Sequence, residues 1–272
     1  MRISRARGAL FAMLTGSALA FAGAIPAAHA QSSVNDALNA AQQMASALDG
    51  AGGGISTAEQ IAALESAAAL GDTMALWQLG LMYESGQGVA QDKAKAFGYF
   101  QIIASTDSAP RGVDADIVAQ SILKVGEYYR EGLPEAGLAP DPLKYERGVQ
   151  RAAAVFGNAD AQYLLGEMYS SDEALGDIPV LSYRWLLAAA RKGHALAQAQ
   201  LGSLLFNGGE GVAQDPVRGL MWLTVASRRA VGTPDEAWIN DTLNADMSIA
   251  TPEQRALAVT LADSLVQEFA SL

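Results

Sequence analysis

A short motif, or phrase, of apolar and small residues recurs along this chain. In it a leucine directly precedes a glycine, and a tyrosine or an apolar residue follows three residues after the glycine. The phrase is clearest at 75–83, 161–169 and 197–205, and a fainter copy covers 119–129. Apolar positions within each copy lie three and four residues apart, the spacing of one face of an α-helix. Self-similarity at this period predicts a solenoid, and its marker glycines are Gly80, Gly126, Gly166 and Gly202.

Each clear copy is followed by signals for a second helix. In the first unit Gly86-Gln87-Gly88-Val89 predicts a turn, and Asp92 is expected to cap the helix that follows. The last unit repeats this order at 208–212 and Asp215. The glycine of the first phrase removes bulk where the second helix crosses the first. We therefore expect an all-α, right-handed α-solenoid of four helix pairs, since one pair cannot bury its own apolar face.

The second and third units depart from the pattern. The third lacks the glycine pair between 170 and 179, although Asp177 and Trp185 keep its register. The second carries two insertions, 105–116 and 130–142. Insertions in a repeat array often lie on one face and bind partners, but loops also tolerate insertion without any function. Both interpretations remain open for these two segments.

The first thirty residues have the pattern of a secretory signal peptide. Arg2, Arg5 and Arg7 precede an apolar run, and Ala28-His29-Ala30 is a small-x-small cleavage site. We expect cleavage after Ala30 and a periplasmic mature chain. A retained membrane anchor is the alternative, and the shortness of the apolar run disfavours it.

The rest of the chain divides into three parts. Residues 31–55 combine a weak apolar helical stripe with a Gly-rich linker, and this segment either docks or stays poorly ordered. The solenoid is expected over 56–232 and opens with a capping box at 56–59. Residues 233–272 predict a C-terminal helical cap with Thr-Pro boxes at 233 and 251. Its final helix is expected to bury one face, made by Leu257, Leu261, Leu265 and Phe269.

The charge balance excludes two classes of partner. The chain has 18 Lys and Arg against 29 Asp and Glu, a net charge of −11. Nucleic acids and anionic membranes require a basic footprint that this composition lacks. We expect no nucleic-acid binding and no membrane insertion of the mature chain, and a basic protein surface suits it better. With no cysteine, disulfides and thiol chemistry are excluded.

Few residues could support catalysis, and we expect no cofactor, no metal site and no enzymatic activity. Signal cleavage leaves His194 as the one histidine, and it occupies the slot that Asp72 and Asn158 hold in other units. It is expected to cap a helix, with a catalytic or pH-sensing role as the alternative. Paired loop carboxylates can hydrolyse glycosidic bonds, but solvated surface acids are the expected interpretation of Asp172-Glu173 and Asp114/Asp116.

The repeated residues resemble the Sel1-like repeat family, a relative of the tetratricopeptide repeats. The match is Ala-Ala-x-x-Gly-x-x-x-Ala-x-x-x-Leu-Gly-x-x-Tyr-x-x-Gly-x-Gly-Val-x-x-Asp, and 68–92 fits it almost throughout. The resemblance covers about 67–229 and implies a protein-binding scaffold. By analogy with the tetratricopeptide groove, it implies a concave partner-binding face to which Trp77, Leu81, Glu127, Arg130, Tyr163, Glu167 and Phe206 contribute. Packing of Trp77 and Tyr163 between repeats is the alternative.

The order of features is similar to a family of periplasmic negative regulators of exopolysaccharide synthesis, the ExoR family. This similarity rests on the signal-peptide pattern, the four units, the segment 128–134, at which a loop interrupts the second unit, the segment 156–162 and the C-terminal helical cap. The resemblance implies a regulator that binds the periplasmic domain of a sensor histidine kinase and represses two-component signalling. It also implies removal by a periplasmic protease. The alternative is a general repeat scaffold or a hydrolase acting on cell-wall polysaccharide.

Overall fold

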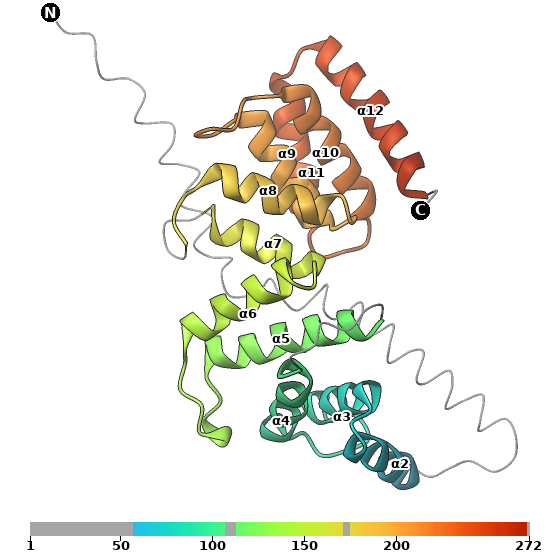
Figure 1. Cartoon of the computed structure of the whole chain (residues 1–272). Coiled ribbons are helices and arrows are strands. Elements are labelled where there is room, and N and C mark those ends of the chain that lie inside the picture. The colour runs from blue at the N-terminus through green and yellow to red at the C-terminus, as the bar shows by residue number, and fades with distance from the viewer. Residues whose placement is uncertain (1–56, 107–112, 171–174, 271–272) are drawn as a thin grey trace, which may run out of the picture. The chain divides into compact units, whose positions relative to one another are not determined.

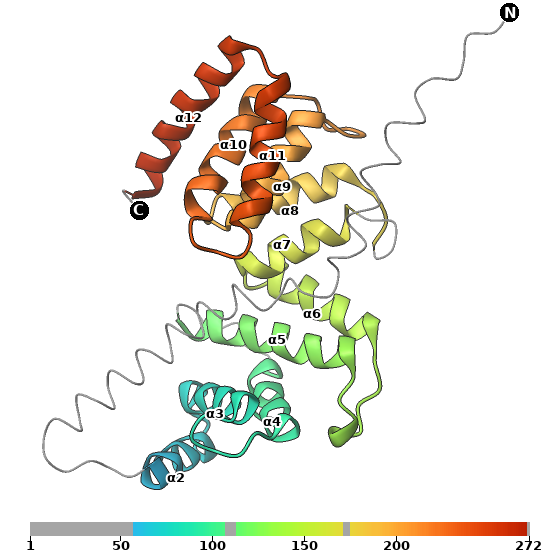
Figure 2. The same ribbon diagram turned by 180° about the vertical axis from the view of Figure 1, so that it is seen from behind.

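The computed structural model describes residues 57–106, 113–170 and 175–270, and these residues form α-helices joined by short turns (Figures 1 and 2). The expected signal peptide, the 31–55 segment and Ser56 of the capping box at 56–59 lie outside the described residues. The helices are α2 (Thr57–Ala69), α3 (Thr73–Ser85), α4 (Lys93–Ala104), α5 (Val113–Glu131), α6 (Pro142–Ala154), α7 (Ala159–Met168), α8 (Pro179–Ala190), α9 (Ala195–Asn207), α10 (Pro216–Arg229), α11 (Glu236–Ile249) and α12 (Pro252–Ala270).

The helices pack in chain order as four antiparallel pairs, so the predicted all-α solenoid is confirmed. Unit 1 is α3 with α4, unit 2 is α5 with α6, unit 3 is α7 with α8, and unit 4 is α9 with α10. Each second helix also contacts the first helix of the next unit. Helix α2 packs on α3 at one end, and α11 and α12 pack on α10 at the other. None of the described helices is both long and apolar enough to cross a membrane.

The marker glycines lie where the two helices of a unit cross, as predicted. A Cβ atom added to Gly80 would lie 2.5 Å from the Phe100 ring, and one added to Gly202 would lie 2.8 Å from the carbonyl oxygen of Gly219. Both separations are shorter than any normal van der Waals contact. The glycines therefore set the spacing of the helices within each pair.

The first helices of units 1, 3 and 4 begin with the same cap. The side chains of Asp72, Asn158 and His194 each accept a hydrogen bond from the backbone N–H three residues later, at 2.7, 2.9 and 3.1 Å. In each case the preceding glycine has positive φ and directs the chain into the helix. The prediction that His194 caps a helix is confirmed.

Unit 3 corrects one detail of the sequence register. The residue at the N-cap of α8 is Ile178, with no side-chain hydrogen bond, and Asp177 lies one position too early to cap. Trp185 keeps the register, because it lies seven residues after Ile178 as Trp222 lies seven after its cap Asp215. Loss of the capping carboxylate follows from the altered 170–179 segment.

The C-terminal cap closes the last unit through a small apolar cluster. Its helix α12 packs on α10. The cluster is completed by Val217, Leu243 and Met247 at its edge, and its buried members are Phe206, Leu220, Ala250 and Ala258.

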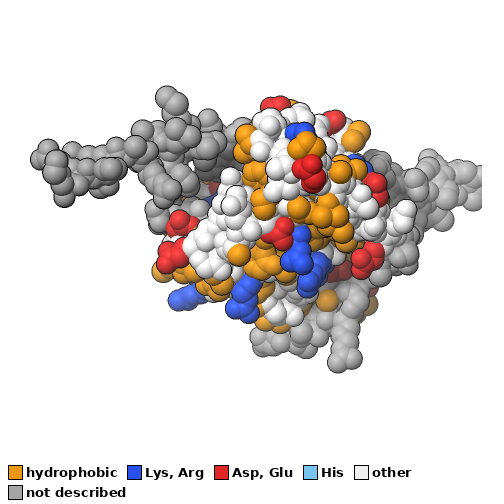
Figure 3. Space-filling view, turned by 90° about the horizontal axis from the view of Figure 1, so that it is seen from above, with side chains coloured by type: hydrophobic (Ala, Val, Ile, Leu, Met, Phe, Trp, Pro, Cys, Tyr) orange, Lys and Arg blue, Asp and Glu red, His pale blue; other side chains and the backbone are white. Residues whose placement is uncertain are grey.

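The face of α12 that packs inward differs from the predicted one. Ala258 and Ala262 are fully buried, whereas Leu257 is 51% and Leu261 36% exposed. Close approach of α12 to α10 favours alanine over leucine at the contact, so two of the predicted leucines point to solvent. The view from above shows hydrophobic side chains at the surface (Figure 3).

The two Thr-Pro boxes behave differently. Thr251 and Gln254 form the reciprocal capping box, with Gln254 N donating to the Thr251 hydroxyl at 3.2 Å and Thr251 N donating to the Gln254 side chain at 2.9 Å. At the first box, Thr233 instead donates its hydroxyl to Ala230 O at 2.7 Å, and α11 begins only at Glu236. The predicted capping box at 233 is therefore not formed.

Candidate protein-binding surface

The first helices of the units, α3, α5, α7 and α9, carry the residues predicted to meet a partner. Helices α3, α7 and α9 each begin at a side-chain cap, and all four first helices pack on the second helix of their own unit. The structure divides the predicted residues by burial. One group lies in the core, and the other lies at the boundary with solvent.

Trp77, Leu81, Tyr163 and Phe206 are core residues rather than the exposed anchors that the sequence predicts, each at most 5% exposed. The Trp77 ring lies 5.2 Å from the Phe100 ring. The neighbouring glycines and alanines bring helices close enough to cover these positions, so groove positions borrowed from the tetratricopeptide repeat do not stay open here.

Tyr163 shows how a predicted surface residue is covered. Its ring stacks on the His194 ring, with centroids 4.6 Å apart. His194 accepts the capping N–H at Nδ1, so its Nε2 faces Asp160, whose carboxylate lies 3.4 Å away. The pair Tyr163 and His194 therefore joins units 3 and 4, and the histidine acts as a structural cap.

Glu167 lies beside Tyr163 at the solvent boundary. Gln200 donates from Nε2 to Glu167 Oε1 at 2.8 Å, and the Tyr163 hydroxyl is also hydrogen-bonded to this carboxyl. Burial raises the pKa of the Glu167 carboxyl, and these two hydrogen bonds oppose part of that increase. Glu167 is therefore a carboxylate held in a fixed position with incomplete hydration.

Glu127 and Arg130 lie one helical turn apart on α5, and both are half-buried. Burial raises the pKa of the Glu127 carboxyl, while the charges of Lys124 and Arg130 oppose the increase. Glu127 forms no hydrogen bond or ion pair within the described part of the chain. The Arg130 guanidinium lies 5.1 Å from the centre of the Tyr145 ring on α6.

A third contact joins units 1 and 2. Lys124 Nζ lies 2.9 Å from Glu84 Oε2, and the Tyr128 hydroxyl donates to Glu84 Oε1 at 3.0 Å. Burial and the Glu84 charge raise the pKa of the Tyr128 hydroxyl. Together these polar side chains form a series from unit 1 to unit 4. We name it the inner polar row, and its members are Glu84, Lys124, Glu127, Arg130, Tyr145, Glu167 and Gln200.

Two of the three carboxylates in the inner polar row, Glu127 and Glu167, belong to one electrostatic environment. Both Glu127 and Glu167 raise the pKa of the Tyr145 hydroxyl, whose own burial is the larger cause. Partly dehydrated carboxylates gain most from a cationic donor that replaces the lost water. The row is therefore suited to bind basic side chains of another protein.

Sequence reasoning missed Lys124, Tyr145 and Gln200. The analogy with the tetratricopeptide groove considers only the first helix of each unit, and Tyr145 lies on the second helix of unit 2. Gln200 lies on the first helix of unit 4, one turn before Ser203, which occupies in that unit the position of Leu81 and Glu167. A search for polar residues one turn from each groove position would have found Gln200 but not Tyr145.

The described residues contain no group of three or more His, Cys, Asp or Glu side chains able to hold a metal ion. Asp172 and Glu173 lie outside the described residues. Asp114 and Asp116 lie in the first turn of α5 rather than in a loop, because that helix begins earlier than the insertion boundary suggests.

The sequence matches the Sel1 repeat family model at 73–105, 159–194 and 195–230, which correspond to units 1, 3 and 4. Unit 2, with its two insertions, lies between the matched segments. An exopolysaccharide production negative regulator of Rhizobium meliloti (strain 1021) is 30% identical over 208 residues, covering 76% of this chain and 75% of the relative. A protein with the same description from Rhizobium leguminosarum bv. viciae is 30% identical over 207 residues, covering 76% and 75%.

Solved structures share the fold. A Sel1 repeat protein from Oxalobacter formigenes has a TM-score of 0.59 and 23% identity, covering 81% of this chain and 83% of its own. A protective antigen of uropathogenic Escherichia coli with an SLR fold has a TM-score of 0.63 and 22% identity over 82% of this chain. That alignment spans only 44% of the antigen.

Proposed function

The chain belongs to the family of the exopolysaccharide production negative regulators and contains Sel1 repeats, and we propose that it represses exopolysaccharide production by binding another protein. It acts as a scaffold without catalytic activity of its own. Its effect depends on occupancy of the partner, so removal of the chain relieves repression.

The proposed partner is the periplasmic domain of a sensor histidine kinase in a two-component system. The resemblance to the regulator family supplies this partner and the inhibitory sign. A periplasmic location fits the basic start at Arg2 to Arg7 and the cleavage motif that ends at Ala30. A periplasmic protease that destroys the chain would then release the kinase.

The observation that carries the proposal is the inner polar row. Glu127 and Glu167 are partly dehydrated, and Glu127 forms no bond to any described group. A basic segment of the partner supplies the missing donors. Arg130 adds a cation beside these two carboxylates. The row therefore favours a partner surface that places basic groups opposite Glu127 and Glu167 and an acidic group opposite Arg130.

The interface therefore runs through Glu127, Arg130 and Glu167, without the buried aromatic residues. Replacing one anchor of an interface costs about 2 kcal/mol, which is about thirty-fold in affinity. Glu127→Gln and Glu167→Gln keep side-chain size and remove the charge. Glu135→Gln changes an exposed acid in the short 3₁₀ helix Pro134–Ala136 that follows α5, and it is the matched control.

The test combines a gene deletion with chromosomally restored variants. The deletion is expected to raise exopolysaccharide output, and the parental chain and Glu135→Gln to restore control. The double variant Glu127→Gln/Glu167→Gln is expected to fold, to lose binding to the purified kinase domain and to leave output high. An unchanged output in the deletion strain would contradict the regulatory proposal. Full control by the folded double variant would place the interface elsewhere.

A further inference from the structure

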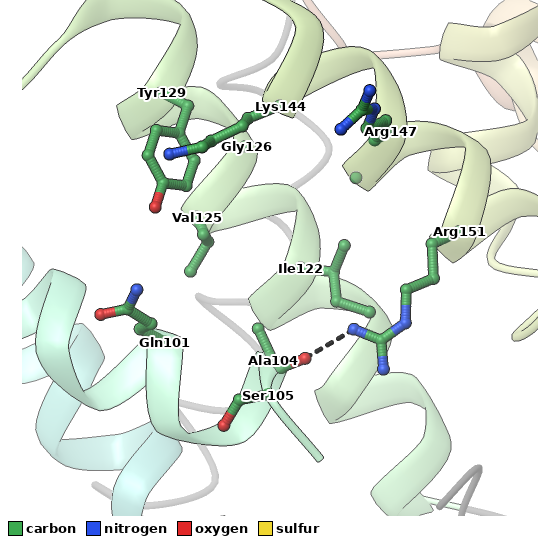
Figure 4. Close-up of a pocket in the computed structure, with 11 residues that line it drawn as sticks. Gln101, Ala104, Ser105, Ile122, Val125, Gly126, Tyr129, Lys144, Arg147 and Arg151 are labelled. Carbon is green, nitrogen blue, oxygen red and sulfur yellow. Dashed lines mark hydrogen bonds between the residues drawn. The ribbon is translucent and has the colours of Figure 1, made fainter. Parts of the chain in front are cut away.

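A surface hollow, separate from the inner polar row, lies between α4, α5 and α6 of units 1 and 2 (Figure 4). It has a volume of about 260 Å³. Its floor is apolar and small, with Ile122 and Val125 from α5 and Ala104 from the end of α4. Gly126 and Gly148 also line it.

The rim of this hollow is basic. Lys144, Arg147 and Arg151 lie three and four residues apart, so they share one face of α6. No carboxylate is among the described residues that line the hollow. This is unusual for a chain of net charge −11. Three cations around an apolar floor form a surface whose charge is opposite to that of the whole chain.

The cations are incompletely neutralised. Arg147 is exposed and makes no hydrogen bond or ion pair within the described residues. Lys144 Nζ lies 3.7 Å from Asp141 Oδ2 and 4.3 Å from the centre of the Tyr129 ring, and the lysine remains about half exposed. Arg151 donates only to backbone carbonyls. The rim thus retains donors and positive charge for an external anion.

The hollow continues into a second depression beside the 130–142 insertion. Gln101, Tyr129 and Lys144 line both, and the second depression extends along 136–141 with a volume of about 480 Å³. The insertion is held in place by the buried Leu133, whose N–H donates to Leu138 O at 2.9 Å. The result is an elongated groove, which fits an extended chain better than a compact ligand.

We propose that this groove binds an extended peptide segment of a protein partner, in which an apolar side chain is flanked by Asp or Glu. The apolar side chain enters the hollow over Ile122 and Val125. The acidic side chains meet Lys144 and Arg147. Docking at this groove is separate from the inner polar row and does not depend on which protein occupies that row.

The test selects peptides from an unbiased phage-displayed library of twelve-residue sequences on the purified full chain. The expected consensus has Asp or Glu next to Leu, Ile or Phe. Binding of the selected peptides is expected to fall at least tenfold with Lys144→Glu/Arg147→Glu. Gln101→Glu, a near-isosteric change at an exposed groove residue, is expected to weaken it as well.

Arg218→Glu is the matched control. Arg218 occupies in unit 4 the position of Lys144 in unit 2, three residues after an N-cap aspartate, and its guanidinium lies 3.5 Å from that carboxylate. It is 69% exposed and lines neither depression. This variant should bind the peptides like the parent chain, and circular dichroism should show that all variants fold.

Three results would overturn the inference: no consensus, a basic consensus, or equal peptide binding by the parent and the double variant. Calorimetry with D-glucuronate tests a small acid as occupant, and its binding in place of peptides would also overturn the inference. Failure here leaves exopolysaccharide control through Glu127 and Glu167 intact. Conversely, peptide binding with no effect of deletion on exopolysaccharide would contradict only the proposed function.

Discussion

The guanidinium of Arg151 donates a hydrogen bond from Nη1 to the carbonyl oxygen of Ala104 at 2.6 Å, and this contact connects the ends of two consecutive second helices, α6 and α4. Later units have a comparable cation, but it lies at a different position of the unit. Lys192 donates to Gly157 O, and the Arg229 guanidinium lies beside Gly193. The Arg151 cation thus lies at the negative C-terminal end of α4.

Arg151→Ala is expected to destabilise the chain by about 2 kcal/mol, because two charge-assisted hydrogen bonds are lost and carbonyl groups are left without donors. Urea unfolding followed by circular dichroism measures the change. Arg147→Ala, four residues earlier and exposed, should change stability by less than about 0.5 kcal/mol. Equal effects of the two substitutions would show that the contact with Ala104 contributes nothing.

Two helical glycines should respond oppositely to alanine. At Gly202 the new methyl group would lie 2.8 Å from backbone oxygen that cannot move easily, so Gly202→Ala should cost about 1–3 kcal/mol. Gly98 in α4 has no atom within 4 Å of the new position, so Gly98→Ala should stabilise by about 0.5–1 kcal/mol. Thermal melts of both variants check the pair. Stabilisation by Gly202→Ala would mean that the crossing is looser than described.

Asp246 on α11 predicts a pH dependence of stability. Its carboxyl is buried, one of its oxygens has no hydrogen-bond partner among the described residues, and burial raises its pKa to about 6. Since the folded-state pKa exceeds the unfolded value, the charged form is disfavoured by folding. Stability is therefore lost as pH rises through about 6.

Asp246→Asn should remove that loss. The variant is expected to be about 1 kcal/mol more stable than the parent at pH 8, a modest value because the carboxylate keeps partial access to water. Near pH 3.5 the two chains should be equally stable. Urea titrations at both pH values measure the difference, with the exposed Asp241→Asn on the same helix as control. A benefit that persists unchanged in acid would exclude titration of Asp246 as its cause.

Much of the fold follows from local sequence signals. The glycine at each crossing, the cap slot shared by Asp72, Asn158 and His194, and the Thr251 box all depend on residues within one or two turns. Such signals are visible without knowledge of the neighbours. They predicted the helix pairs and the role of His194.

The errors on α12 and on the first helices concern contacts between helices distant in sequence, whereas the errors at Asp177 and Thr233 are local. Leucine spacing on α12 indicated an apolar face, but the close approach to α10 placed Ala258 and Ala262 at the contact. Thr233 lost its capping role because its hydroxyl donates back to Ala230. Which side of a first helix stays open depends on the helices packed against it, so Trp77 and Tyr163 could not be placed from sequence alone.

Burial of Trp77 changes what its substitution should do. Trp77→Ala removes an aromatic side chain that is 5% exposed and packs on Phe100, so a loss of about 3–5 kcal/mol in unfolding free energy is expected. Any loss of exopolysaccharide control should then follow the fall in folded protein. Glu127→Gln, by contrast, should reduce partner binding with little change in stability.

Comparing Trp77→Ala with Glu127→Gln requires stability and partner binding to be measured on the same samples. Unfolding free energy from urea titration is set against binding of the kinase domain at a temperature where each variant is folded. Trp77→Ala should bind like the parent chain under those conditions, because its side chain does not reach the surface. A folded Trp77→Ala protein that binds tenfold more weakly would instead make Trp77 part of the interface. In that case unit 1 would have to open before the partner binds.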